Sequence, residues 1–307
     1  MKRFFSHIWI TAIHEFKDSI RSRWAVSLML IYLAICMFMS YQFTGFLAKA
    51  EIQVMKTLSV AEGAKAGAVT SRLWETKTYR NIMMEVYKQD EELVDHLVQV
   101  HPVVLIYAWF TVILGAMLTL LMSSPRVADE LGTRSARFVL YRSDQLSWCL
   151  GKYWGQAIVL LPVLLVSALG VWVIAAIRLE GFKPVQMLSY LMEYGFMSYL
   201  YVLAWLGLAT CVSQLTKSQF LAVVFAIGGA FVFGVIEGFH EHFRWFETDK
   251  TNWRQLIDVF YQFTPMSYRG HLWGPERSRQ IIAGLMLIGL GHLFLVLGYF
   301  ATYRRDI

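Results

Sequence analysis

SSPRVADELGTRSARFVLYRSDQLSWCLGK, residues 123–152, is the stretch on which the organisation of this chain depends. It is a polar interruption between two long apolar segments, and it mixes five basic with three acidic side chains. The basic residues are Arg126, Arg134, Arg137, Arg142 and Lys152, and the acidic residues are Asp129, Glu130 and Asp144. Because charges of both signs alternate along it, we interpret this stretch as a docking surface and not as a simple basic run.

The composition of the chain indicates a polytopic membrane protein. Of the 307 residues, 57% are hydrophobic and only 16% are charged, whereas about a quarter of the residues of soluble proteins are charged. Most of the length lies in apolar stretches of about 20 residues, which is enough to cross the bilayer hydrocarbon as a helix. We therefore expect an all-α fold in a single membrane domain covering residues 1–307.

Six apolar segments predict transmembrane helices, at about residues 25–48, 103–124, 153–177, 188–213, 219–238 and 280–302. Two long loops, residues 49–102 and 239–279, connect them on one side, and residues 125–152 and 214–218 connect them on the other. A further span within residues 49–102 is excluded, because each of its charges would cost about 3 kcal/mol at the bilayer centre. Helical spacing of apolar residues predicts helices lying against the membrane in both long loops, in the second at Trp253, Leu256, Ile257, Phe260 and Phe263.

Residues 1–24 predict an amphipathic helix in the membrane interface. The apolar residues recur every three or four positions from Phe5 to Ile20, whereas Glu15, Lys17, Asp18 and Arg21 fall on the opposite face. The segment has no uninterrupted apolar centre and no cleavage site for a signal peptidase, so we expect it to remain on the mature protein.

The distribution of charge predicts which side of the membrane each loop occupies. The two termini together with residues 125–152 and 214–218 carry a net charge of +7, whereas the loops of the opposite side carry about +1. Short cytoplasmic segments retain Lys and Arg. We therefore expect both termini and the loop 125–152 to be cytoplasmic, and the loops 49–102 and 239–279 to be extracytoplasmic. The formal charge of +6 is scattered between the spans, so we expect no nucleic-acid partner.

The fifth predicted span carries a stripe of small residues four positions apart: Ala222, Ala226, Ala230, Gly234 and Gly238. In lipid, small residues let helix backbones approach closely, which stabilises helix association. Two interpretations remain open, namely packing within the same bundle and contact with a second copy of the chain.

Residues with the chemistry of catalysis or metal binding are few. His240-Glu241-His242 has poor spacing for one metal site on a helix, and the three cysteines form no C-x-x-C pair, so we expect no metal site. Glu193, Glu237 and His292 lie in or near apolar spans and are candidates for acid or base groups. The chain lacks the phosphate-binding loop of ATPases and the common hydrolase motifs, so we expect no catalytic residue.

The layout and several local motifs resemble the membrane subunits of type-2 ABC transporters, the permeases of ABC exporters. In that family the second span is followed by an acidic residue, a Gly-Thr pair, a leucine-rich segment and an arginine, and a Gly-Lys pair opens the third span. The similar residues here are Glu130, Gly132-Thr133, Phe138 to Leu140, Arg142 and Gly151-Lys152. Glu15-Phe16-Lys17-Asp18 is similar to part of the family's elbow helix, and Arg304-Arg305-Asp306-Ile307 is similar to its ending. The chain has no proline at the expected end of the coupling segment, where Ser143-Asp144-Gln145 stands instead.

The resemblance implies a cytoplasmic coupling helix near residues 128–141 that docks on a separate ATPase subunit. It also implies a complex of two permease and two ATPase chains, with ATP and magnesium bound by the partner and no cofactor in this chain. The implied docking residues are Asp129, Glu130, Gly132, Thr133, Arg134, Arg137, Arg142 and Lys152. We expect an exporter in the plasma membrane, the bacterial inner membrane, in contact with lipid and paired with itself or with a second permease.

Two other classes of function remain open. The first is a membrane-embedded enzyme acting on lipid, with Glu193, Glu237 or His292 as its acid or base. The second is a membrane scaffold or sensor that transports nothing.

Overall fold

The computed structural model describes residues 2–57, 77–86, 91–179, 183–245 and 252–303, and every regular element within them is a helix. Six helices contain stretches long and apolar enough to cross a membrane. They are α2 (Arg23–Thr57), α6 (Pro102–Gly132), α8 (Gln145–Arg178), α9 (Pro184–Leu215), α10 (Gln219–Trp245) and α13 (Arg277–Tyr303). The prediction of an all-α polytopic protein with six spans is therefore confirmed.

Shorter helices lie before and between the spans. They are α1 (Lys2–Arg21), α4 (Lys77–Val86), α5 (Glu91–Val98), α7 (Ala136–Leu140), α11 (Asn252–Gln262), the 3₁₀ helix η1 (Pro265–Tyr268) and α12 (Arg269–Leu272). Helices are thus present in both long loops, as predicted. The predictions for residues 58–76, 87–90 and 246–251 and for the Arg304–Ile307 ending lie outside the described residues.

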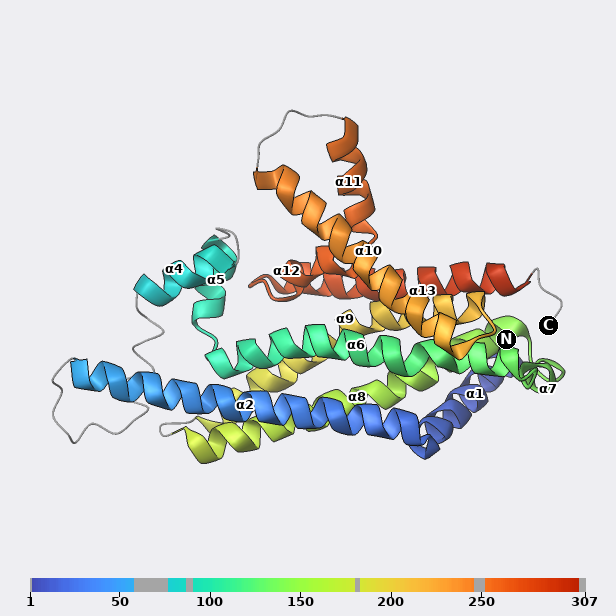
Figure 1. Ribbon diagram of the computed structural model, residues 1–307, viewed down its shortest axis with the longest axis horizontal. Coiled ribbons are helices and arrows are strands. Elements are labelled where there is room, and N and C mark those ends of the chain that lie inside the picture. The colour runs from blue at the N-terminus through green and yellow to red at the C-terminus, as the bar shows by residue number, and fades with distance from the viewer. Residues whose placement is uncertain (1, 58–76, 87–90, 180–182, 246–251, 304–307) are drawn as a thin grey trace.

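Helix α9 is the centre of the bundle, because it packs against α6, α8 and α13. Helix α2 packs on α6 and α8, and α1 packs along α8. Figure 1 shows that α10 crosses α6 and then diverges from the bundle, with α11 folding back beside it. The beginning of α1, helix α7 and the end of α13 lie at one end of the molecule, on the right in Figure 1. The two ends of the described chain therefore lie at the same end of the bundle as the loop 125–152.

The contact between α9 and α13 depends on two glycines whose backbones touch. A methyl group added at Gly207 would lie 2.2 Å from the carbonyl oxygen of Gly291. At Gly291, an added methyl group would lie 2.7 Å from the carbonyl oxygen of Leu203. Close backbone approach of this kind stabilises helix association in lipid. The hydrophobic effect contributes little there, because the lipid tails are as apolar as the side chains. The two helices are therefore held in direct backbone contact.

Helix α6 runs past the predicted end of the second span near residue 124 and continues through Pro125 to Gly132. A proline inside a helix leaves the carbonyl four residues earlier without its usual donor. Here the carbonyl of Leu121 accepts a hydrogen bond, at 3.5 Å, from the indole Nε1 of Trp24 at the start of α2. The tertiary contact compensates for the missing backbone donor, and the helix continues.

A partly buried histidine lies at the opposite end of α6. His101 is the N-cap, and its Nδ1 accepts a hydrogen bond from the backbone nitrogen of Val103 at 3.3 Å. Burial lowers the pKa of His101 to about 4, so the ring stays neutral at pH 7 and keeps the lone pair that the cap requires.

Candidate functional site

Helix α1 turns a small and polar face toward α8 and an apolar face outward. Phe5 and Trp9 are exposed, whereas Ala12, Glu15 and Ser19 are buried. Glu15 lies on the polar face of the predicted amphipathic helix, yet only 1% of its surface is accessible. Helical spacing placed Glu15 correctly opposite the apolar residues, but the polar partners that bury it come from distant parts of the chain.

Two glycines of α8 allow α1 to approach closely. A methyl group added at Gly151 would lie 2.4 Å from Cβ of Thr11, and one added at Gly155 would lie 2.6 Å from Cβ of Glu15. These separations are shorter than any non-bonded carbon contact, so a larger residue at either position would push the helices apart. The Gly-Lys pair at residues 151–152 therefore has a structural reason for its glycine.

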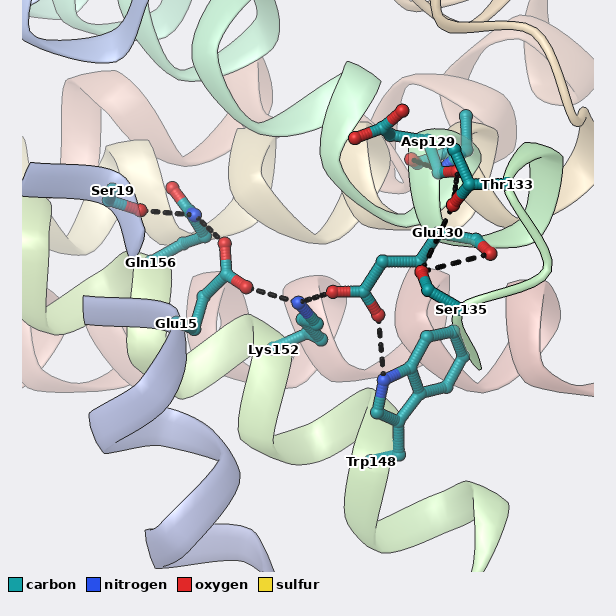
Figure 2. A network of polar contacts seen from close by, with 11 residues as sticks. Glu15, Ser19, Asp129, Glu130, Thr133, Ser135, Trp148, Lys152 and Gln156 are labelled. Carbon is teal, nitrogen blue, oxygen red and sulfur yellow. Dashed lines mark hydrogen bonds and ion pairs between the residues drawn. The ribbon is translucent and has the colours of Figure 1, made fainter. Parts of the chain in front are cut away.

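The lysine of that pair, Lys152, joins three helices. Its Nζ donates hydrogen bonds to Glu15 Oε2 on α1 and to Glu130 Oε1 on α6, and both contacts are ion pairs (Figure 2). Glu130 Oε2 accepts a further bond, at 3.2 Å, from the indole Nε1 of Trp148, which lies one turn before Lys152 on α8. The Lys152 side chain is only 9% exposed and that of Glu15 only 1%.

Gln156, one turn after Lys152, completes the network. Its Nε2 donates to Glu15 Oε1 and, at 2.9 Å, to Ser19 Oγ (Figure 2). Its Oε1 accepts from Ser123 Oγ at 3.3 Å. Each of the four carboxylate oxygens of Glu15 and Glu130 thus accepts at least one hydrogen bond. We call Glu15, Glu130, Trp148, Lys152 and Gln156 the Lys152 network.

A buried ion network of this kind constrains geometry more than it stabilises the fold. Removing ions from water costs several kcal/mol each, and their mutual attraction repays that cost only while every partner stays in place. Separating α1 from α8, or the end of α6 from α8, would leave a carboxylate or an ammonium group buried without its partner. The beginning of α8, the end of α6 and α1 are therefore held as one unit.

Two of the predicted docking residues contact the turn between α9 and α10. The Asp129 Oδ1 accepts a hydrogen bond from Gln219 Nε2, and a methyl group added at Gly132 would lie 2.4 Å from the carbonyl oxygen of Lys217. The glycine of the Gly-Thr pair therefore permits a close contact between the two short connections on this side.

The remaining predicted docking residues surround a hollow of about 680 Å³ on the surface at this end of the molecule. Thr133, Arg134, Arg137 and Arg142 line it together with Phe138 and Tyr141. Phe138 is 82% exposed and Tyr141 is 95% exposed. Arg134 has a φ of 60°, a left-handed conformation that turns the chain from α6 into α7. We call these six residues the α7 surface.

An N-cap fixes the exit from the α7 surface into α8. Asp144 Oδ2 accepts hydrogen bonds from the hydroxyl of Ser147 and, at 3.3 Å, from its backbone nitrogen. These bonds, the hydroxyl first, lower the pKa of Asp144, so the cap is ionised at pH 7. Asp144 thus caps the start of α8 in the stretch where the family pattern has a proline.

Comparison with known proteins agrees with this layout. A family model described as ABC-2 family transporter protein matches residues 9–306. The chain belongs to this family of type-2 ABC transporter permeases. None of the curated protein sequences compared with the chain matches it significantly. The match covers the spans and the loop between α6 and α8, so the permease assignment applies to the whole described bundle.

The small-residue stripe of the permease divides into two parts. Ala222 and Ala226 are fully buried, and Ala230 is partly buried against the main core. At Gly234 and Gly238, by contrast, an added methyl group would meet no atom within 4 Å. The first part of the stripe therefore packs within the chain, and the second part faces open space.

The candidate acid and base residues Glu193, Glu237 and His292 lie in different surroundings. Glu237 pairs with Arg269, at 3.3 Å from Oε1 to Nη2. His292 Nδ1 lies 2.8 Å from the carbonyl oxygen of Ile288, and its ring packs against Tyr153 and Trp154. Glu193 is exposed on α9. His240 Nδ1 lies 2.9 Å from Asp258, and in the described part of the chain no three metal-binding side chains converge.

The sequence interpretation missed the role of three members of the Lys152 network: Glu15, Trp148 and Gln156. A signal for two of them was present, because Trp148, Lys152 and Gln156 recur every four residues and so share one face of α8. A lysine and a glutamine on the inner face of a helix require buried partners.

Replacement of Lys152 by methionine is expected to destabilise the permease by about 3–5 kcal/mol, because the buried Glu15 and the partly exposed Glu130 would both lose their cation. Thermal unfolding of the purified protein in detergent measures the effect. Lys17→Met is the matched control, since Lys17 is an exposed cation on α1. The triple variant Lys152→Met, Glu15→Gln, Glu130→Gln should regain most of the lost stability. Equal unfolding temperatures for Lys152→Met and Lys17→Met would contradict the account.

Proposed function

We propose that this permease is the membrane subunit of an ATP-driven exporter and that a separate ABC ATPase docks on the α7 surface. The observation that carries the proposal is the exposure of Phe138 and Tyr141 beside three arginines at the end where both described termini lie. Exposed aromatic side chains together with arginine are typical of the residues that dominate the energy of protein interfaces. The arginines favour a partner groove with acidic residues at its rim.

The lengths of the flanking helices support a position of α7 outside the lipid. Helix α6 has 31 residues and α8 has 34. At 1.5 Å per residue each is about 45 Å long or more, whereas the hydrocarbon core is about 30 Å thick. The ends of both helices therefore extend from the membrane and hold α7 in water. The positive charge of this side favours the cytoplasm, where ATP is available.

The Lys152 network gives docking a mechanical consequence. A force on the α7 surface passes to the end of α6 and the start of α8, and the network adds α1 to the moving unit. ATP can drive such a movement only if the nucleotide-bound ATPase binds the two conformations of the permease unequally. The permease itself would bind neither ATP nor magnesium, and the partner would hold both. We place the complex in the plasma membrane with α1 and the end of α13 in the cytoplasm.

A homodimer is the assembly that the exposed face of α10 supports best. Phe220, Val224, Ile227, Phe231 and Val235 form an apolar stripe along this face, and all five are exposed. Only 11% of the residues in the apolar stretch of α10 are buried within the chain, compared with 22% or more for the other five spans. A helix with so few internal contacts is the natural site for a second copy, which would complete a complex of two permeases and two ATPases.

Charge reversal at Arg137 and truncation of Tyr141 are expected to weaken ATPase binding. Arg137→Glu and Tyr141→Ala should each lower affinity at least tenfold, the range of interface hot spots. Copurification in mild detergent with ABC ATPases encoded in the same genome, followed by an ATPase assay, measures this. Lys183→Glu is the control, because Lys183 is an exposed cation at the start of α9, away from α7. The docking assignment fails if both variants retain partner and activity at the level of the control.

A cysteine at Phe231, which is 73% exposed, should crosslink two permease chains in native membranes. Val166→Cys on α8 is the control, since Val166 is 46% exposed on a different helix. Ala230→Cys should also remain monomeric, because Ala230 packs inward. Crosslinking from Val166 and not from Phe231 would place the dimer contact elsewhere.

A further inference from the structure

A second hollow, of about 690 Å³, is lined by residues of α10, α11 and α12. Residues of α5, α6 and α13 complete its wall. The volume falls within the range of roughly 300–1,000 Å³ that is usual for sites binding small organic molecules. We call this hollow the outer pocket.

Glycines on α10 keep the outer pocket open. Gly234 and Gly238 line it, as does Gly270 of α12, and an added methyl group at any of the three would meet no atom within 4 Å. The contrast is with Gly207, where the neighbouring backbone leaves no room for a side chain. The glycines of the pocket wall therefore do not serve helix packing within this chain; they leave volume beside α10 unfilled.

The charged groups of the outer pocket favour a cation. Four carboxylates line it, those of Glu92, Glu237, Glu241 and Glu276, against the two guanidinium groups of Arg269 and Arg279. Each guanidinium group is already neutralised by a carboxylate, Arg269 by Glu237 at 3.3 Å and Arg279 by Glu276 at 2.7 Å. With its histidines counted as neutral, the described lining has a net charge of −2.

The aromatic groups of the pocket point to the same chemistry. Trp109, Tyr261 and Trp273 line it, and the rings of Trp109 and Trp273 lie 6.3 Å apart. The Arg269 guanidinium lies 5.3 Å from the centre of the Trp109 ring while it pairs with Glu237. One organic cation, the protein's own, is thus already held by an aromatic face and a carboxylate together, which is how proteins recognise ammonium groups.

We propose that the outer pocket binds an amphiphilic organic cation. Its ammonium group would lie within the negatively charged lining beside the aromatic side chains, and its apolar body would fill the space beside Gly234 and Gly238. The cation can be a soluble amine or the ammonium headgroup of a lipid, because α10 is a membrane span whose outer end borders the pocket. The proposal concerns binding alone and holds whether or not the permease transports the ligand.

Equilibrium dialysis of the purified protein in dodecyl maltoside with octyltrimethylammonium tests the proposal, with octyl sulfate as the anionic probe of equal chain length. The unmodified protein should bind the cation saturably and bind the anion at least tenfold more weakly. Gly234→Leu and Gly238→Leu should each lower cation affinity at least tenfold, because their side chains fill the pocket without meeting neighbours. Glu237→Gln should also weaken cation binding, since it leaves the Arg269 guanidinium without its carboxylate and makes the lining less negative.

Gly228→Leu is the matched control. Gly228 lies on the same helix, an added methyl group there also meets no atom within 4 Å, and the residue does not line the pocket. Its cation affinity should equal that of the unmodified protein, with all variants checked for an unchanged unfolding temperature. Equal affinity in Gly228→Leu and Gly238→Leu, or equal binding of the anion, would overturn the proposal. A second dialysis experiment uses glycerophosphocholine as the probe. If the protein binds it and Gly238→Leu abolishes that binding, the ligand is a lipid headgroup. If the protein binds octyltrimethylammonium but not glycerophosphocholine, the ligand is a soluble amphiphile.

Discussion

A single buried ammonium group fixes the arrangement of the α7 end of this permease. Lys152 needs both Glu15 and Glu130 as partners, because a cation removed from water is tolerated only beside compensating charge. That requirement brings together residues more than 100 positions apart and so joins α1, α6 and α8. Gly151 and Gly155 make the approach of α1 possible, and without them the ion pairs would be out of reach.

The unit formed by α1 and the adjoining ends of α6 and α8 lies between the α7 surface and the core of the bundle. On one side of it, the α7 surface presents aromatic and basic side chains to water; on the other, α9 and α13 touch through Gly207 and Gly291. Helix α10 is the least buried of the spans, and it borders the outer pocket. Under the proposed mechanism, a movement imposed on α7 would pass through this unit to the spans, while the proposed ligand would lie in the hollow beside α10.

Much of the fold was readable from the sequence, because long apolar segments in a sparsely charged chain have few alternatives to membrane helices. The six spans, the helices of the long loops and the polar character of residues 125–152 were predicted on that basis. The length of α6 was not, because Trp24 supplies the donor that Pro125 lacks, and this contact spans about a hundred residues of sequence. Buried Glu15 was missed for the same reason, since periodicity identifies a face and not what lies against it.

The residues predicted to dock on an ATPase fall into two groups in the structure, which the sequence pattern did not distinguish. Glu130 and Lys152 belong to the motif that resembles the family, yet they point toward each other inside the bundle. Arg134, Arg137 and Arg142 reach the surface, where Phe138 and Tyr141 join them. The sequence alone did not distinguish the two groups, because a basic residue that pairs inside the bundle and one that reaches the surface carry the same charge.

The structure of the permease bound to its ATPase, determined without nucleotide and again with ATP, tests the central claim most directly. The account predicts that Lys152 keeps both ion pairs in the two states, and that α1, α7 and the adjoining ends of α6 and α8 superpose as one body that moves relative to α10. Separation of Lys152 from Glu15 or from Glu130 in either state, with α1 and α7 moving independently, would contradict it.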